Sequence, residues 1–157
     1  MNDLDEILRR PLDALMPHRD PMILLTRAAG MEDEAFVAEV DISEHSPFFE
    51  EGGVPAWIGL EYMAQTVGLF SGVEGALAGR DVLPGLLLGA RTYSSGREQF
   101  FAGETLRIVA RKVLQQDNGI SAMECSIQDP TGMELAQAQL TVIQLPTMAA
   151  LDEVSRP

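Results

Sequence analysis

The sequence predicts an α+β fold in which an antiparallel sheet of about five to six strands wraps around one long central helix. Residues 57–74, WIGLEYMAQTVGLFSGVE, form the longest stretch with helical spacing of apolar side chains. Elsewhere, several short segments alternate between apolar and polar residues, and most are separated by tight turn signals. Short turns favour antiparallel pairing, and a helix that is apolar on all sides has to be covered by other elements.

The central helix is predicted over Trp57–Glu74. Its apolar side chains recur at three- and four-residue steps, the spacing of one helix face: Leu60, Met63, Ala64, Val67 and Phe70. Almost nothing on the opposite face is charged, so we expect the helix to be buried on several sides. Ala64, Gly68 and Gly72 remove side-chain bulk along one line, where a neighbouring element can approach the backbone closely.

The segments before this helix are predicted as connectors and strands. Asp5–Arg10 and Leu12–Met16 are two short helical turns, each followed by a proline. Met22–Arg27 is apolar enough to open a strand. Glu34–Ile42 alternates and predicts a half-buried strand. Ser43–Pro55, with two prolines and two glycines, predicts a loop.

Four further strands are expected after the helix: Leu86–Tyr93, Thr105–Val113, Ser121–Gln128 and Glu134–Leu145. Asp117-Asn118-Gly119 is a strong hairpin signal, and imperfect alternation in the last strand indicates a bulge. Gly75–Gly85 is predicted as a loop, and Gly96–Gly103 as a bend with Arg97 and Glu98 exposed. Met148–Pro157 is predicted as a tail.

Length and composition indicate one domain over residues 1–157, with a core at about 12–145 between a short lead-in and the tail. The net charge of −13 argues against binding to nucleic acid or to an anionic membrane surface. The single cysteine, Cys125, excludes an internal disulfide and fits the cytoplasm. The acidic N-terminus does not resemble a secretory signal, and no apolar run predicts a membrane span.

Glu61 stands within the apolar run of the central helix. A carboxyl group in apolar surroundings tends to be held protonated, which a general acid requires. Alternatively, Glu61 interacts favourably with the helix dipole in the first turn and has no catalytic role. Gln65, one turn further on, lies on the same side, where its side chain can hydrogen-bond Glu61 or a ligand.

Two segments carry a resemblance to a known family. Residues 16–25, MPHRDPMILL, and residues 59–65, GLEYMAQ, occur in the order and spacing of the hotdog-fold 3-hydroxyacyl-[acyl carrier protein] dehydratases of fatty acid synthesis. Within that group the chain is most similar to the dehydratase-like proteins of aryl-polyene gene clusters. The resemblance covers about Leu12–Leu145, and it implies a hotdog fold.

The family's mechanism implies a histidine that accepts the C2 proton and an acidic helix residue that protonates the leaving 3-hydroxyl group. Glu61 occupies the acidic position. The family's Gly-His-Phe-Pro segment is missing after residues 47–49, PFF, which leaves His45 as the candidate base. The resemblance further implies that several residues contact the substrate: His18, Gly53, Val54, Pro55, Trp57 and Gln65.

Three functions remain open at this point. The first is a self-sufficient dehydratase that acts on acyl chains bound to acyl carrier protein. The second is a non-catalytic or partner-dependent subunit of a heteromeric dehydratase, which the missing histidine segment and the acidic surface favour. The third is a hotdog thioesterase. A single sheet leaves an exposed edge, so we expect a homodimer or a heterodimer with a second hotdog subunit. Neither a cofactor nor a metal site is expected.

Overall fold

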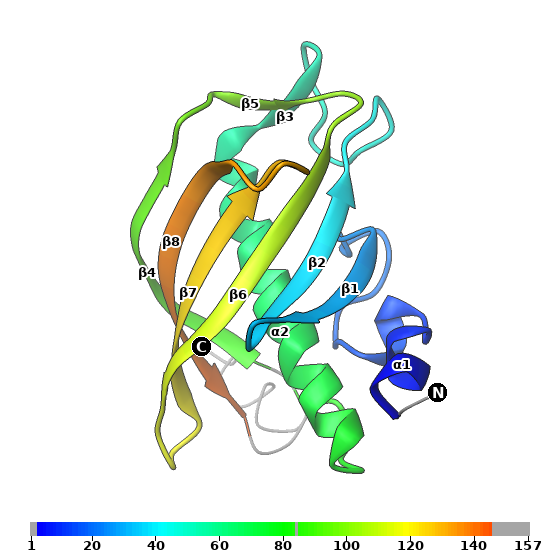
Figure 1. Ribbon diagram of the computed structural model, residues 1–157, viewed down its shortest axis with the longest axis vertical. Coiled ribbons are helices and arrows are strands. Elements are labelled where there is room, and N and C mark those ends of the chain that lie inside the picture. Colours follow the sequence, from blue (N-terminus) through cyan, green and yellow to red (C-terminus); the bar gives the residue numbers. More distant parts are fainter. Residues whose placement is uncertain (1–2, 84, 146–157) are drawn as a thin grey trace, which may run out of the picture.

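A six-stranded antiparallel sheet curves around helix α2 (Gly59–Leu77) in the computed structural model, which describes residues 3–83 and 85–145 (Figure 1). Across this sheet the strands follow the order β1 (Arg27–Glu32), β2 (Ala35–Asp41), β6 (Thr105–Gln115), β7 (Ile120–Gln128), β8 (Glu134–Gln144) and β4 (Gly85–Ser95). Each neighbouring pair is antiparallel. This arrangement confirms the predicted α+β fold.

Helix α2 is buried on several sides, as its all-round apolar sequence predicts. Met63, Val67 and Phe70 belong to the core, and the ring of Phe70 stacks on that of Phe36 from β2 at 5.3 Å. A 3-10 turn, η2 (Ala56–Ile58), leads directly into the helix. The helical segment therefore starts close to the predicted Trp57, but it continues three residues beyond Glu74, to Leu77.

The close approach expected along the small residues of α2 occurs at Gly72. A Cβ atom on Gly72 would overlap the carbonyl oxygen of Leu15, which lies in the connector between the N-terminal turns and β1. Those turns are α1 (Asp3–Leu8) and η1 (Leu12–Ala14), close to where the sequence predicts them. Leu15 is completely buried, so the connector is pressed against the helix. Gly68, one turn earlier, faces open space instead.

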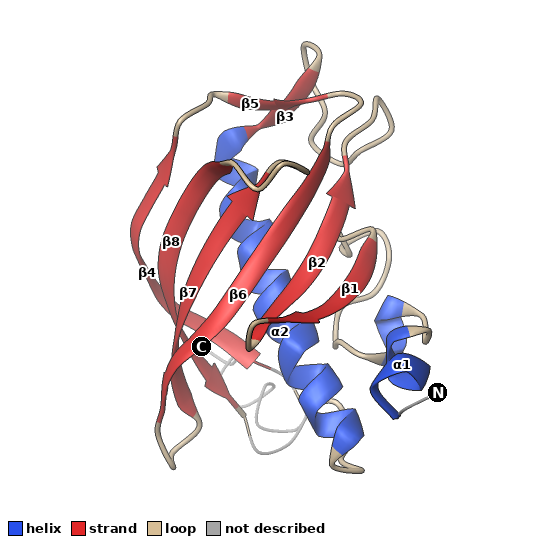
Figure 2. Cartoon of the chain, in the orientation of Figure 1, coloured by secondary structure: helices blue, strands red, loops and turns tan. Residues whose placement is uncertain are grey.

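Two predicted irregular segments contain short strands. Within the predicted loop, β3 (Gly53–Pro55) pairs with β5 (Gln99–Phe101) from the predicted bend, and this two-stranded sheet lies beside the start of α2 (Figure 2). A Cβ atom on Gly53 would lie 2.5 Å from the carbonyl oxygen of Phe100, so the pairing requires glycine there. Strands this short obtain their pairing from tertiary structure, which local patterns do not reveal.

The predicted strand opening at Met22–Arg27 is wrong for most of its length, because β1 begins only at Arg27. The backbone of Met22 and Leu24 is hydrogen-bonded to the side chain of Gln65 rather than to a strand. The predicted bulge is present, since the partner in β8 steps from Ala136 to Glu134 between Ile127 and Gln128 of β7. The predicted tail lies outside the described residues.

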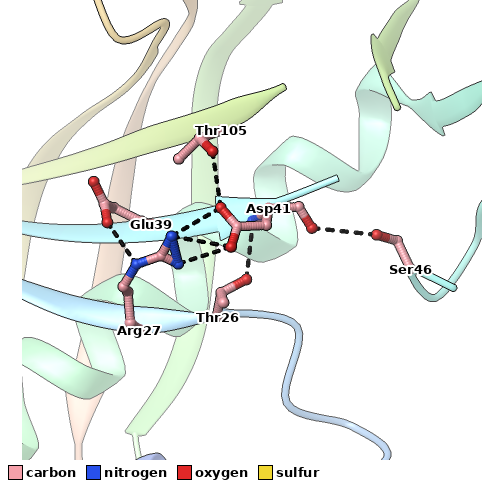
Figure 3. Close-up of polar contacts among 6 residues, drawn as sticks. All are labelled: Thr26, Arg27, Glu39, Asp41, Ser46 and Thr105. Atoms are coloured by element: carbon pink, nitrogen blue, oxygen red, sulfur yellow. Dashed lines mark hydrogen bonds and ion pairs between the residues drawn. The ribbon is translucent and has the colours of Figure 1, made fainter. Parts of the chain in front are cut away.

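Arg27 connects the first two strands to the start of the following loop (Figure 3). Its guanidinium forms an ion pair with Asp41 at 2.8 Å and another with Glu39 at 2.8 Å. Asp41 also accepts a hydrogen bond from the hydroxyl of Thr105 on β6, and its carbonyl oxygen accepts one from Ser46. These bonds to Asp41 anchor the start of the loop that follows β2.

Candidate active site

The start of α2 is held in place by contacts from two other segments. The Ala56 amide donates to the carbonyl oxygen of Glu98 at 2.9 Å, and the hydroxyl of Tyr93 on β4 donates to the carbonyl oxygen of Ala56. Burial raises the pKa of Tyr93 to about 12, so this hydroxyl remains a donor at neutral pH. A Cβ atom on Gly59 would collide with the Tyr93 hydroxyl, which explains glycine at this position. No side chain caps the turn or the helix.

Glu61, in the first turn of α2, is hydrogen-bonded to Gln65 as the sequence spacing suggests. The Gln65 amide nitrogen donates to Glu61 Oε1 at 3.0 Å and to the carbonyl oxygen of Met22 at 2.8 Å. The Gln65 oxygen accepts from the Leu24 amide at 2.8 Å, which fixes the orientation of the buried Gln65 amide. Glu61 itself is exposed in the single chain, contrary to the burial that its apolar neighbours predict.

A cavity of about 270 Å³ lies between α2 and the concave face of the sheet. Glu61 and His18 both line this cavity, together with Ala64 and Gly68. The small side chains at positions 64 and 68 leave room along the helix. The cavity therefore brings together two of the residues that the sequence singles out, Glu61 and His18.

The cavity extends along α2 toward Glu74. At about 1.5 Å rise per residue, Glu61 and Glu74 lie about 20 Å apart along the helix axis. The wall between them is mostly apolar: Val67, Leu83, Leu87, Met123, Val142 and Ile143. A cavity that runs along the helix with apolar walls between its polar residues suits an acyl chain.

Sequence reasoning missed the polar end of this cavity. Lys112 forms an ion pair with Glu74 at 2.9 Å and lies over the ring of Phe70, while Gln144 donates to the hydroxyl of Ser71 at 2.6 Å. Ser71 and Glu74 are three residues apart and so share one side of α2, but the helical period turns that side away from Glu61, so the spacing from Glu61 does not reveal them. No sequence signal identifies Lys112, because its position depends on the register of β6.

His45, the candidate base from the sequence, does not line this cavity. It lies in the loop after β2, its side chain is 86% exposed, and its Nε2 atom is 3.4 Å from Glu44. The loop is closed by local hydrogen bonds, in which Ser43 accepts from the His45 amide and Ser46 accepts from the Ser43 amide. The single chain thus separates His45 from the Glu61 cavity, and its catalytic role stays a prediction.

The other candidate substrate contacts lie outside the cavity lining. Gly53, Val54 and Pro55 form the buried strand β3. Trp57 is 68% exposed and meets the ring of Phe48 edge-on at 6.3 Å. These residues flank the start of α2, close in sequence to Glu61, but the single chain does not place them on the cavity wall.

Metal and thiol chemistry find no support in the described residues. Across residues 3–83 and 85–145, no three histidine, cysteine, aspartate or glutamate side chains cluster as metal ligands. Cys125 is buried in the core, and burial raises the pKa of its thiol to about 12. A thiol in that state is a poor nucleophile.

Within residues 3–83 and 85–145, no helix is long and apolar enough to cross a membrane.

Comparison with known proteins decides the family. The model of the ApeP-like family, described as ApeP dehydratase, matches residues 10–153. The chain belongs to the ApeP-like dehydratase family. This result confirms the dehydratase class that the two motifs indicate. A search of curated proteins found no match to this ApeP-like chain.

Solved structures agree with that assignment. A chain of the dehydratase heterocomplex ApeI:P from Xenorhabdus doucetiae superposes on the ApeP-like protein with a TM-score of 0.83 at 27% identity, over 94% of this chain and 99% of that chain. A putative thioesterase, yhdA from Lactococcus lactis, matches with a TM-score of 0.61 at 14% identity, over 93% and 100% of the two chains. A hypothetical thioesterase from Streptococcus pneumoniae, solved with coenzyme A, gives 0.59 at 18% identity, over 76% and 84%. At these lower identities the likeness shows the shared hotdog fold alone.

Proposed function

We propose that this ApeP-like protein dehydrates 3-hydroxyacyl thioesters carried on acyl carrier protein to trans-2-enoyl thioesters, in fatty acid or polyene biosynthesis, with Glu61 as the general acid. The observation that supports this role is the position of Glu61 in the wall of a cavity that runs along α2 and whose lining also includes a histidine. The reacting carbons would lie beside Glu61, and the rest of the acyl chain would extend along α2 toward Glu74.

Gln65 prepares Glu61 for this role. The Gln65 amide donates to Glu61 Oε1, which orients the carboxyl group and leaves Oε2 to face the substrate. Oε2 is thus the atom that would protonate the leaving 3-hydroxyl group. The backbone amides at the start of the η2 turn, which no side chain caps, would polarise the thioester carbonyl. Glu61 is exposed in the single chain, so it would lose its surrounding water only when substrate or a second subunit covers it. The acid would therefore act only on bound substrate.

A second hotdog subunit is part of this proposal. Strand β4 forms one edge of the six-stranded sheet, and most of its described side chains are exposed, including Leu87 and Leu88. A long apolar edge strand invites pairing with another strand. The similar ApeI:P structure is itself a heterocomplex. The net charge of −13 further favours a partner, because acyl carrier proteins are acidic and this chain alone would repel them.

The decisive experiment is mass spectrometry of a 3-hydroxyacyl carrier protein incubated with this protein, alone and with a co-purified second hotdog subunit. Loss of one water from the acyl chain is the expected result. Glu61→Gln is expected to lower the rate about 10²-fold or more. Glu74→Gln, on the same helix and at the far end of the same cavity, is the matched control and should retain the reaction.

Two outcomes would contradict the proposal. Release of free acid without water loss would identify a thioesterase instead. If Glu61→Gln dehydrates as fast as the unvaried protein, Glu61 does not act as the acid. Water loss that occurs only with the second subunit, and that still requires Glu61, would define a partner-dependent dehydratase.

A further inference from the structure

Strand β4, which forms an edge of the six-stranded sheet, contains a β-bulge near its end (Figure 1). Between Arg91 and Ser94, β4 holds one residue more than the facing segment of β8. The two residues inside this bulge are Thr92 and Tyr93. An extra residue of this kind changes the direction of the side chains around it, and such bulges are common beside active sites.

Thr92 has an unusual backbone conformation within the bulge. Its φ angle is 56°, in the left-handed region that β-branched residues rarely adopt. The Thr92 hydroxyl donates to the carbonyl oxygen of Arg91 at 2.7 Å. Residues in strained conformations persist only where the surrounding structure imposes them, and they are frequent at functional sites. The strain at Thr92 therefore directs attention to the side chain that follows it, that of Tyr93.

Tyr93 is turned inward, unlike most of its strand. The residues of β4 from Leu87 to Thr92 are exposed, whereas Tyr93 is half-buried and packs against the hydrophobic core. Its hydroxyl donates to the carbonyl oxygen of Ala56 in η2, the turn that leads into α2. Gly59 leaves the space that this hydroxyl occupies, because a Cβ atom there would overlap it. A side chain of the sheet edge thus reaches the first turn of the central helix.

The carbonyl oxygen of Ala56 has another partner besides this hydroxyl. It also accepts from the Gly59 amide at the end of η2. Removing the hydroxyl therefore leaves no unpaired carbonyl, so the cost in stability is small compared with that of orphaning a buried group. What the hydroxyl adds is a link between the turn and β4. Because Glu61 follows Gly59 by only two residues, the position of this turn sets the position of the acid.

From these contacts we propose that Tyr93 is a positioning residue for the dehydration, whose hydroxyl fixes the first turn of α2 and with it the carboxyl group of Glu61. The inference rests on the proposed dehydratase function. Gln65 orients Glu61 from the side of the N-terminal connector, and Tyr93 orients it from the sheet edge. The same edge strand is the one proposed for the second subunit, so one element serves both subunit docking and the geometry of the acid.

The test compares Tyr93→Phe with Tyr62→Phe in the dehydration assay, in the arrangement, alone or with the second subunit, in which the unvaried protein dehydrates. Tyr93→Phe keeps the ring and removes only the hydroxyl. Its kcat is expected to fall about 10-fold or more, with KM within a few-fold, because misplacing a catalytic group by about 1 Å can cost about 10²-fold in rate. Tyr62 is the other tyrosine of the chain, and its ring lies 6.2 Å from that of Phe100 in the core. Tyr62→Phe, the same chemical change, should stay within a few-fold of the unvaried rate.

A double-variant cycle tests the contact itself. Gly59→Ala places a methyl group where the tyrosine hydroxyl lies, so it should lower kcat by a factor similar to that of Tyr93→Phe. In Tyr93→Phe the hydroxyl is gone, and the nearest remaining atom is the terminal methyl group of Ile127, which can shift. The double variant should therefore be no slower than the slower single variant. Losses that simply multiply would show that the two positions act independently and would overturn the inference.

Two further measurements separate positioning from a merely structural role. The thermal midpoint of Tyr93→Phe should fall by only a few degrees, and its loss of kcat should persist at temperatures where both proteins are fully folded. Sedimentation should show unchanged assembly with the second subunit. A loss of kcat that disappears on cooling, or one that accompanies loss of the second subunit, would overturn the inference.

The remaining outcomes are equally clear. A kcat of Tyr93→Phe within a few-fold of the unvaried value would overturn the inference while leaving the Glu61-dependent dehydration intact. A raised KM with unchanged kcat would assign Tyr93 to substrate binding and would also overturn it. If the unvaried protein dehydrates in neither arrangement, the proposed function fails and this inference fails with it.

Discussion

Gln65 is the residue on which the geometry around Glu61 depends. It is 1% exposed, and its amide makes hydrogen bonds to Leu24, Met22 and Glu61 at 2.8–3.0 Å. One side chain thus connects the acid of the proposed mechanism to the chain segment that follows His18. Because these bonds use both amide protons and the oxygen, Gln65 orients groups around the site, and we propose this role for it in place of substrate contact.

Gln65→Leu is expected to lower both stability and activity. The change removes the side-chain partner of the Met22 carbonyl and of the Leu24 amide, which costs about 1 kcal/mol for each lost hydrogen bond. Glu61 also loses the donor that orients it, so kcat should fall. Urea unfolding and dehydration assays measure the two effects. Gln99→Leu is the control, because Gln99 makes one exposed hydrogen bond, to Glu50 at 3.3 Å. Equal effects in the two variants would contradict this role.

The pair Arg97–Glu104 gives a prediction about pH. Partial burial raises the pKa of Glu104, but hydrogen bonds from Arg97 and from the Phe101 amide, together with the charge of Arg97, outweigh it and lower the pKa below 4.5. A depressed carboxyl pKa stabilises the fold above about pH 4.5, and this stabilisation is lost as the pH falls through the lower, folded-state value.

The sequence predicted that Arg97 would be exposed. Its side chain is only 27% exposed, because it forms an ion pair with Glu104.

We therefore expect Glu104→Gln to lower the free energy of unfolding by about 1 kcal/mol at neutral pH. The difference between the variant and the unvaried protein should shrink in acid, where Glu104 is protonated in both states. Urea unfolding at several pH values measures this difference. A constant difference across that range would show that the ion pair is not its source.

Two glycines of helix α2, Gly68 and Gly72, have different roles. Gly72 allows the Leu15 carbonyl to touch the helix, whereas Gly68 faces the cavity with nothing within 4 Å of its Cβ position. Gly68 and Gly72 are one helical turn apart, which suggests a shared function, but the two glycines have different contacts. Gly72 positions the connector that carries His18, and Gly68 keeps the cavity open beside Glu61.

Gly68→Val is expected to narrow the cavity without harming the fold. The new side chain meets open space, and replacing glycine by valine in a helix adds roughly 0.3 kcal/mol of helix stability. If the acyl chain occupies the cavity, KM should rise several-fold for long acyl chains and less for short ones. Gly68→Ala is the graded control. Unchanged KM for all chain lengths, with normal stability, would place the acyl chain elsewhere.

The whole sheet is asymmetric at its two edges. Strand β4 forms one edge over eleven residues and leaves Leu87 and Leu88 exposed, at 43% and 54%. The other edge, β1, has six residues and carries the ion pairs of Arg27. Charged side chains discourage strand pairing and apolar ones favour it. The molecule as a whole therefore has one edge suited to a second subunit, and that is β4.

Leu88→Lys is expected to weaken association through β4. Leu114→Lys is the matched control, because Leu114 is 55% exposed but lies near the end of β6, an inner strand of the sheet, where it pairs with Ala122 of β7. Light scattering or sedimentation measures the oligomeric state of both variants. Loss of the dimer in both, or in neither, would exclude β4 as the specific interface.

The sequence determined the elements whose signals are local. The apolar spacing of α2, the alternation of the strands and the turn at Asp117-Asn118-Gly119 are properties of neighbouring residues, and the two motifs place the chain in its family. Tertiary structure decided what depends on residues distant in sequence. It paired β3 with β5, exposed Glu61, and set His18 rather than His45 beside the cavity. The physical reason is that a side chain's environment is supplied by whichever distant segments pack against it, and local periodicity does not encode which segments those are.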